Sequence, residues 1–140
     1  MVILSVDYGD KRTGIAVCDR MEMLASPVTV VWGDYAPKVI AEIEKITAEY
    51  KPEQIVVGLP KNMDGSEGER AEKCRDFAQL LSEKTGIETV MVDERLTTVS
   101  AHKALNVTDV RGQKRKNIVD AVSAVMILES YLSKRKAANK

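Results

Sequence analysis

The sequence has few of the residues that mark common specialised sites. Aromatic side chains make up 4% of the 140 residues, with one tryptophan and one phenylalanine, which argues against a platform of stacking rings for single-stranded nucleic acid. One histidine and two cysteines without a CxxC pair exclude a zinc site and a redox motif. Basic and acidic residues number 21 each, so the chain has no overall basic charge of the kind that coats nucleic acid.

Long hydrophobic runs are also missing. The N-terminus, Met1 to Asp7, begins apolar without a basic leader and reaches a charge too early for a signal peptide or a membrane span. We therefore expect a cytoplasmic protein that does not enter a membrane. Cys18 and Cys74 are expected to be buried free thiols.

The composition that remains is that of an ordinary globular protein. Hydrophobic residues make up 44% and charged residues 30%, and no linker or internal repeat interrupts the chain. A chain near this length buries roughly 70% of its unfolded surface. We therefore expect a single domain over residues 1–140.

Two hydrophobic periods predict the secondary structure. Short, mostly alternating or apolar runs predict five strands, within 2–7, 13–19, 23–32, 55–59 and 89–92. A period near 3.6 predicts four helices, which are about 37–50, 66–85, a short one from Thr97 or Thr98 to Leu105, and 116–134. Ser66 and Glu69 are expected to form a capping box, and residues 106–114 a loop.

The order of these elements predicts an α/β fold. Three strands in hairpin sequence come first, and the remaining strands alternate with helices, which favours an open mixed sheet with right-handed crossovers. The apolar run from Ile55 to Leu59 is typical of a strand covered on both faces. Helices are therefore expected on both faces of the sheet.

Carboxylates stand at three places that suggest chemistry. Asp7 ends the first apolar strand, where open α/β sheets bind ligands, although a turn aspartate would also stand there. Asp93 and Glu94 follow the fifth strand on opposite sides, so at most one of them joins Asp7. Asp120 lies beside the buried stripe of the last helix, where it complements the helix dipole or needs a partner. Oxygen ligands from several elements suit Mg²⁺ or Mn²⁺, and such a cluster supports phosphoryl transfer.

Basic residues lie close to these acids along the chain. Lys11 and Arg12 follow Asp7, Arg95 follows Glu94, and four basic residues lie within 111–116. From Arg111 onward there are eight basic and two acidic residues, which leaves 13 basic and 19 acidic residues before it. We therefore expect a local phosphate-binding patch beside an acidic metal site. The loop 58–68 leads into a helix N-terminus, whose free N–H groups suit an anion.

Four motifs together point to one family. They are Val6-Asp7-Tyr8-Gly9 with Arg12-Thr13-Gly14, Val57-Gly58-Leu59-Pro60 with Asn62-Met63-Asp64-Gly65, Asp93-Glu94-Arg95-Leu96-Thr97-Thr98, and Asp120-Ala121-Val122. With these motifs the chain resembles the YqgF family, also called RuvX, over nearly its whole length. The resemblance implies an RNase H-like fold, with a five-stranded mixed sheet of order 3-2-1-4-5 in which strand 2 is antiparallel. It also implies Asp7, Glu94 and Asp120 as the catalytic acids that bind Mg²⁺ or Mn²⁺.

The family is linked with maturation of the 5′ end of small-subunit ribosomal RNA and, by analogy with RuvC, with Holliday junction resolution. The resemblance therefore implies a metal-dependent nuclease for structured RNA, with branched DNA as a further substrate and the pre-ribosomal small subunit as a partner. We expect a monomer or homodimer. The residues expected to bind nucleic acid are Lys11, Arg12, Asn62, Arg70, Arg95, Lys114 and Arg115. Unlike RuvC-type enzymes, the chain has Gly58-Leu59-Pro60 where those enzymes have a glutamate at the end of the fourth strand, and it lacks their extra acid in the last helix.

Three alternatives stay open. The enzyme would act on DNA junctions rather than RNA, or the protein would bind nucleic acid or a ribosomal assembly intermediate without cutting it. A third possibility treats residues 7–14 as the phosphate loop of an actin-like or sugar-kinase-like nucleotidase. A chain of 140 residues supplies only one lobe of such an enzyme.

Overall fold

The structure of the chain is a computed structural model that describes residues 1–61, 64–93 and 112–138, with the backbone alone over 112–120. All five predicted strands are present. The elements, in chain order, are β1 (Ile3–Asp7), β2 (Arg12–Cys18), β3 (Ala25–Trp32), α1 (Ala36–Tyr50), β4 (Gln54–Leu59), α2 (Glu69–Thr85), β5 (Glu88–Asp93) and α4 (Gly112–Ala138).

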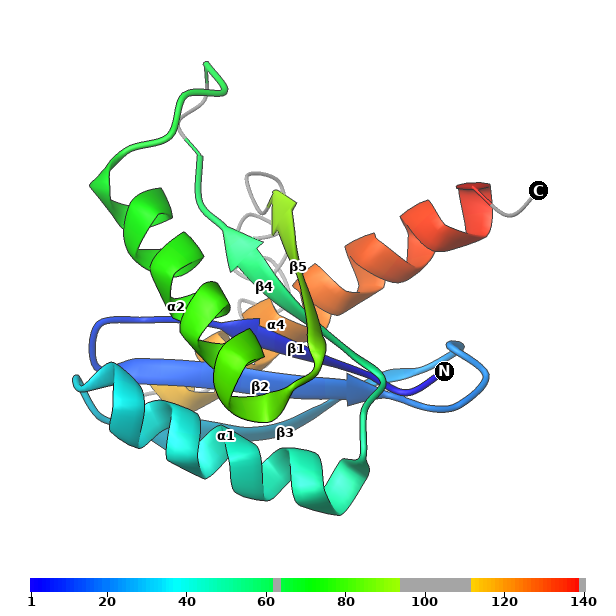
Figure 1. Cartoon of the computed structure of the whole chain (residues 1–140), viewed down its shortest axis with the longest axis horizontal. Coiled ribbons are helices and arrows are strands. Elements are labelled where there is room, and N and C mark those ends of the chain that lie inside the picture. Colours follow the sequence, from blue (N-terminus) through cyan, green and yellow to red (C-terminus); the bar gives the residue numbers. More distant parts are fainter. Residues whose placement is uncertain (62–63, 94–111, 139–140) are drawn as a thin grey trace.

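The strands form one twisted sheet of order β3-β2-β1-β4-β5, which confirms the predicted order. β2 pairs antiparallel with both β1 and β3, whereas β4 is parallel to β1 and to β5. The strand direction turns steadily from β1 to β5 in Figure 1, as the right-handed twist of strands requires. The carboxyl ends of β1, β4 and β5 therefore fan out at one edge of the sheet.

Helices cover both faces of the sheet, as predicted (Figure 1). α1 and α2 lie on one face and α4 on the other. Because side chains alternate along a strand, β1 serves both cores, with Leu4 and Val6 directed to α1 and α2 and Ile3 directed to α4. The larger core also contains Ile15, Val31, Val39, Ile40, Ile43, Ile55, Val57, Phe77, Ala78 and Leu81. The core under α4 contains Ala16, Cys18, Val56, Val92, Ala124, Ile127, Leu128 and Leu132.

Local sequence explains where α1 and α2 end. α1 stops at Lys51, whose left-handed conformation (φ 51°) ends the helix because the residue before a proline is kept out of the right-handed helical region. α2 stops at Gly86, which has φ 70° and donates its N–H to the Ser82 carbonyl over 2.8 Å. Glycine takes up this conformation at little cost, which makes it the usual end of a helix.

Polar contacts determine how α4 lies on the sheet. The Ser5 hydroxyl donates to the Ala124 carbonyl over 2.6 Å, and the Tyr131 hydroxyl donates to Gln54, the residue opposite Ile3, over 2.6 Å. Near its end, Arg135 pairs with Glu22, which also binds the N-terminal amine. Residues later in α4 therefore meet earlier residues of β1, so the helix runs antiparallel to that strand. Its first turns lie toward the carboxyl end of β1.

Two expectations about helix ends were wrong. Ser66 does not cap α2: its hydroxyl donates to Asp64 over 2.6 Å, and Gly68 occupies the N-cap position without a side-chain hydrogen bond. α4 begins at Gly112 rather than Lys116, so the predicted loop 106–114 ends earlier, and it continues to Ala138 rather than Lys134. The short helix expected up to Leu105 lies outside the described residues.

The expectation about the two cysteines is confirmed, since Cys18 and Cys74 are buried free thiols. In the last helix the buried side chains include Ala124, Ile127, Leu128 and Leu132, while Val122 and Val125 are only partly buried. Across the described ranges, no helix combines the length and the hydropathy that crossing a lipid bilayer requires.

Candidate functional site

Asp7 is the last residue of β1 and lies at the edge where the parallel strands end. It pairs with Gly14 of β2, and the preceding residue, Val6, is opposite Val57 of β4. Alternation puts Asp7 on the same face as Ile3 and Ser5, which is the face that α4 covers. Its side chain is only half-buried. An aspartate that is not fully buried thus stands at the carboxyl end of a central strand.

The turn after Asp7 is tight enough to need glycine. A Cβ atom at Gly9 would lie 2.2 Å from the carbonyl oxygen of Arg12, closer than real Cβ contacts occur. The same turn is tied to the neighbouring strand, because the Gly33 N–H donates to the Lys11 carbonyl over 2.9 Å. The backbone therefore folds back on itself directly beside Asp7 and presents Lys11 and Arg12 next to it.

Arg70 of α2 fastens this turn from the side. One guanidinium nitrogen, Nη1, lies 2.6 Å from a carboxylate oxygen of Asp10, and the other, Nη2, donates to the Tyr8 carbonyl. The Tyr8 ring lies beneath the guanidinium and stacks on Phe77, with 3.9 Å between the ring centroids and 12° between their planes. Burial raises the pKa of the Tyr8 phenol above its ordinary value, against the smaller lowering effect of the Arg70 charge. The turn is thus anchored to α2 by apolar and charged contacts together.

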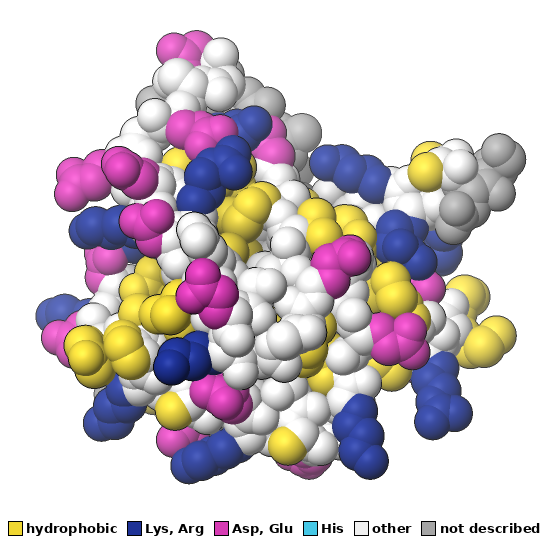
Figure 2. Space-filling view, viewed as in Figure 1, with side chains coloured by type: hydrophobic (Ala, Val, Ile, Leu, Met, Phe, Trp, Pro, Cys, Tyr) yellow, Lys and Arg dark blue, Asp and Glu magenta, His cyan; other side chains and the backbone are white. Residues whose placement is uncertain are grey.

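These residues enclose a pocket of about 430 Å³. Its lining consists of Asp7, Tyr8, Gly9, Asp10, Lys11, Arg12 and Arg70. Three basic and two acidic residues contribute to this lining, a combination that suits a phosphate held beside a carboxylate. Elsewhere charges of the two signs are interspersed, as the face in Figure 2 shows over α1 and α2.

The structure brings together four of the predicted site residues, which are Asp7, Lys11, Arg12 and Arg70. Lys114, Arg115 and Asp120 lie on the described backbone of α4, without described side chains. Asn62, Glu94 and Arg95 lie outside the described residues. Among the side chains that are described, no three from His, Cys, Asp and Glu come close enough to hold a metal ion. The expected three-acid ligand set therefore stays a prediction.

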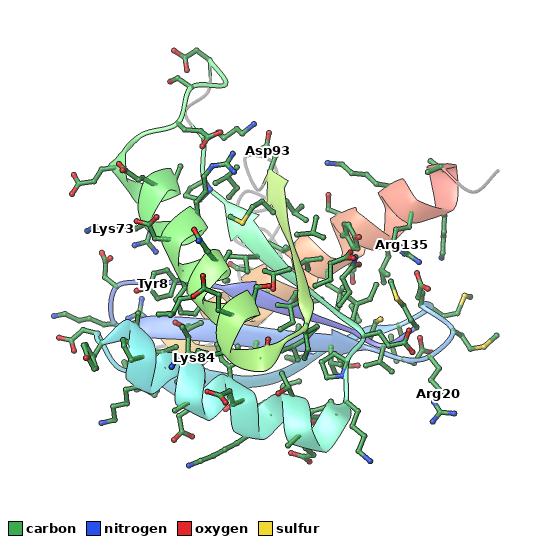
Figure 3. The ribbon with its side chains drawn as sticks, in the orientation of Figure 1. Tyr8, Arg20, Lys73, Lys84, Asp93 and Arg135 are labelled. Carbon is green, nitrogen blue, oxygen red and sulfur yellow. The ribbon has the colours of Figure 1, made fainter. Side chains whose placement is uncertain are left out.

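The position of Asp93 resolves one choice that the sequence left open. Asp93 is the last residue of β5, opposite Leu59 of β4 (Figure 3). Val90 and Val92 contribute to the core under α4, whereas Met91 packs against the other core. Alternation therefore assigns Asp93 to the α1–α2 face, opposite to the face of Asp7. The Asp93 side chain therefore does not share the α4 face with Asp7, and the choice of Glu94 as the metal ligand stays a prediction.

Sequence reasoning did not include Tyr8 and Asp10 in the site. Both line the pocket, and Asp10 provides the carboxylate that pairs with Arg70. Their only signal in the sequence is that they follow Asp7 in the same turn. The contact with Arg70 spans 60 residues, so no local pattern reveals it.

The loop that leads into α2 holds its own ion pair. Arg75 contacts both carboxylate oxygens of Glu67, at 2.7 and 2.8 Å, and this contact lowers the pKa of the Glu67 carboxyl. A carboxylate thus stands one residue before the N-cap Gly68. Because that charge is close to the helix N-terminus, the anion-binding role expected for this terminus stays a prediction.

Known proteins resemble the chain over nearly its full length. The family model described as "RuvX: Holliday junction resolvase" matches residues 1–134. A protein of Agathobacter rectalis named as a pre-16S rRNA nuclease is 44% identical, with 94% of each chain covered. One of the same name from Ruminiclostridium cellulolyticum is 40% identical over 100% of this chain and 99% of its own.

Solved structures with the same fold are much more distant in sequence. RuvC of T. thermophilus, in complex with a Holliday junction, matches with a TM-score of 0.63 at 12% identity and covers 98% of this chain and 96% of its own. The fowlpox virus resolvase with junction DNA matches with a TM-score of 0.60 at 12% identity, over 96% and 99% of the two chains. These likenesses confirm the RNase H-like fold. By the match of the family model and by the identity to its relatives, the chain belongs to the RuvX family of Holliday junction resolvases.

Proposed function

We propose that this protein is a metal-dependent nuclease that hydrolyses phosphodiester bonds in structured nucleic acid, and that its substrate is the 5′ end of pre-16S rRNA. The observation that carries the proposal is the half-buried Asp7 carboxylate at the end of β1, which shares a pocket with Lys11, Arg12 and Arg70. A carboxylate that can bind a metal ion, beside cations that can bind phosphate, supports metal-assisted hydrolysis of a phosphodiester. The names of the relatives support the choice of RNA.

The proposed metal ligands are Asp7, Glu94 and Asp120, for Mg²⁺ or Mn²⁺. Support for Asp120 comes from the register of α4. Ala124 contacts Ser5, and the helix runs antiparallel to β1. Position 120 is one turn earlier in the helix and Asp7 is two residues later in the strand, so both lie in the same direction from the Ser5–Ala124 contact. Support for Glu94 is indirect. At most one of the adjacent acids Asp93 and Glu94 is expected to join Asp7, and Asp93 belongs to the α1–α2 face, opposite to the face of Asp7.

The donor set fits the ion. Three carboxylates supply only hard oxygen ligands, which Mg²⁺ and Mn²⁺ prefer. When bound, such an ion activates water and stabilises the leaving oxygen of a phosphodiester. Lys11, Arg12 and Arg70 would hold the phosphates, together with Asn62, Arg95, Lys114 and Arg115. The anchoring of the turn by Arg70 and Phe77 would keep Asp7 in place when the substrate binds.

A second candidate substrate is the four-way DNA junction. The family description and the shared fold with two junction resolvases favour this candidate. The fold alone does not choose between the substrates, because function depends on the site. The small-subunit precursor as a partner follows only if RNA is the substrate.

The test compares Asp7→Asn with Asp76→Asn. Both changes remove one negative charge, but Asp76 is exposed on α2 and lies outside the pocket. Each protein is incubated with precursor 16S RNA and with a four-way DNA junction at the same salt concentration, with Mg²⁺, Mn²⁺ or a chelator. We expect cleavage of the RNA that needs the metal, is retained in Asp76→Asn and is lost in Asp7→Asn.

Other outcomes assign other functions. Faster cleavage of the junction would make DNA the substrate. Full metal-dependent cleavage by Asp7→Asn would refute the proposed site. A protein that cuts neither substrate, but whose Asp7→Asn variant still supports 16S rRNA maturation in cells, would be a binding protein.

A further inference from the structure

The single tryptophan of the chain, Trp32, is exposed beside the candidate site. Its side chain is 44% accessible to solvent, although tryptophan is highly buried on average in folded proteins. Trp32 is the last residue of β3 and pairs with Arg12, the first residue of β2. The ends of β1 and β3 lie at the same edge of the sheet, because both strands are antiparallel to β2. Trp32 therefore belongs to the edge that carries Asp7.

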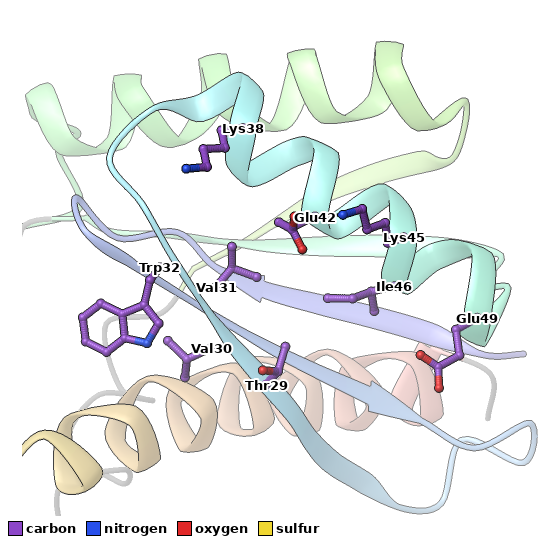
Figure 4. Close-up of a pocket in the computed structure, with 9 residues that line it drawn as sticks. All are labelled: Thr29, Val30, Val31, Trp32, Lys38, Glu42, Lys45, Ile46 and Glu49. Atoms are coloured by element: carbon purple, nitrogen blue, oxygen red, sulfur yellow. Dashed lines mark hydrogen bonds and ion pairs between the residues drawn. The ribbon is translucent and has the colours of Figure 1, made fainter.

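Packing among the described side chains does not account for this tryptophan. It belongs to neither of the two buried cores. Figure 4 shows the indole projecting from the end of β3, away from α1, whereas Val31 is directed toward that helix. The hollow between β3 and α1 does not provide an apolar seat, since Lys38, Glu42, Lys45 and Glu49 contribute to its lining. The indole is thus presented to solvent at the margin of this hollow.

The cation beside the indole is Arg12, which also lines the pocket that contains Asp7. The Arg12 guanidinium carbon lies 5.7 Å from the centre of the Trp32 ring, and Arg12 also lines the pocket with Asp7 and Lys11. Strand spacing and rise put the Cα atoms of Asp7 and Trp32 about 12 Å apart. One strand of nucleic acid with a phosphate at Asp7 therefore reaches Trp32 by passing Arg12.

We propose that Trp32 is a base-stacking residue, which holds one unpaired nucleobase of the strand whose phosphates lie along Lys11 and Arg12. An exposed indole offers a flat apolar surface, and every nucleobase has a matching face. Stacking needs a base that is free of its partner strand, so the bound segment contains an unpaired nucleotide close to the scissile phosphate. This inference rests on the proposed function, and it specifies the substrate as single-stranded or unpaired at that point.

A second copy of the chain is the competing occupant of this edge. A stable protein interface buries about 800 Å² on each partner, and one exposed indole next to a charged hollow supplies only a small part of that area. The neighbouring Lys11 and Arg12 are also suited to a polyanion. A nucleic-acid strand is therefore favoured over a second copy.

The experiment uses Trp32 as its own reporter, because the chain has no other tryptophan. The full-length protein is titrated without metal with a short single-stranded oligouridylate, and tryptophan emission is recorded. A duplex RNA of the same length and a single strand of the same length built entirely of abasic residues are the controls. We expect the single strand to quench the emission, and the duplex and the abasic strand to leave it largely unchanged.

Affinity provides the second readout. By anisotropy, Trp32→Ala should bind the single strand about 5- to 100-fold more weakly, whereas Trp32→Phe should retain most of the affinity. Replacing every base by an abasic residue should weaken binding to the native protein by a similar factor and binding to the Trp32→Ala protein hardly at all, because both changes remove the same contact. Thermal unfolding of each variant checks that the fold is retained.

Each opposing result has a definite meaning. Equal quenching by the intact and the fully abasic single strand, or unchanged affinity of Trp32→Ala, would overturn the role of Trp32. A loss of dimer in sedimentation of Trp32→Ala, without loss of binding, would assign the edge to a second copy. Base-dependent quenching in a protein that never cleaves would leave the stacking role standing while the proposed nuclease fails. If the protein cleaves nucleic acid but Trp32→Ala binds the single strand as tightly as the native protein does, the proposed nuclease stands and the stacking role fails.

Discussion

Replacing Gly9 with alanine tests whether the turn after β1 keeps Asp7 in its position. The added Cβ would lie 2.2 Å from the Arg12 carbonyl oxygen, and real Cβ contacts are essentially never shorter than 3.0 Å. The backbone must therefore move by about 0.8 Å between two residues that line the pocket. A displacement of this kind in a packed region costs about 1–3 kcal/mol, while the stiffer unfolded chain offsets roughly 0.4–1 kcal/mol.

The expected net loss of about 1–2 kcal/mol in the free energy of unfolding lowers Tm by about 3–8 °C for a chain of this size. Activity should fall further than stability, because a shift of about 1 Å in a reacting group costs up to about 100-fold in rate. Differential scanning fluorimetry and metal-dependent RNA cleavage measure the two effects at a temperature well below both Tm values.

Gly68→Ala is the matched control. A Cβ at Gly68 meets no atom within 4 Å, so the only expected effect is a weaker N-cap of α2, worth less than about 1 kcal/mol. If Gly9→Ala has the same Tm and the same cleavage rate as Gly68→Ala, the turn does not constrain Asp7 and the reasoning is wrong.

Three further predictions concern the supports around the site. Ser5→Ala removes the buried hydrogen bond to the Ala124 carbonyl and should lower the free energy of unfolding by about 1–2 kcal/mol in urea titrations; no change would show that this bond does not help to hold α4. Arg135 lowers the pKa of Glu22, so the folded state favours the ionised carboxylate. The stability difference between the native protein and Glu22→Gln should be constant well above pH 4.5, the ordinary pKa, and shrink as the pH falls through the lowered pKa; a difference independent of pH would contradict this. The buried Thr13 hydroxyl has no hydrogen-bond partner among the described residues, so Thr13→Val should leave Tm unchanged or raise it by the equivalent of about 1 kcal/mol, and a clear fall in Tm would mean that the hydroxyl is satisfied.

The strands and the open mixed sheet followed from local patterns in the sequence, whereas the strand order followed from the resemblance to the RuvX family. A run of mostly branched apolar residues identified β1, and alternating residues identified β2. The continuous apolar run of β4 indicated cover on both faces, which the two cores confirm. Helix ends were less predictable, because polar residues have more than one partner to choose from. Ser66 has the spacing of a capping box with Glu69, but the neighbouring Asp64 accepts its hydroxyl instead.

The candidate site was predictable only in part. Asp7, Lys11 and Arg12 lie in one turn, so their proximity follows from the chain itself. The stacking of Tyr8 on Phe77 and the anchoring by Arg70 join segments about 60–70 residues apart, and composition carries no trace of such contacts. The low aromatic content disfavours a platform of several stacking rings, but it does not disfavour stacking of one base on a single indole. The position of one exposed tryptophan becomes informative only when the fold shows what lies next to it.

The packing of α4 antiparallel to β1 has a consequence for the folding of the chain during its synthesis. Ser5 and Ala124 are 119 residues apart in the chain. The face of β1 that α4 covers is therefore exposed until almost the whole polypeptide has been synthesised. Until then Ile3, Ala16 and Val56 form a bare apolar surface on the growing chain. Long-range contacts of this kind form late, and exposed sheet surface invites aggregation in the interval. If Asp120 is the third acid, the site is complete only after α4 has been made, and a ribosome-bound chain that lacks this helix would not cut nucleic acid.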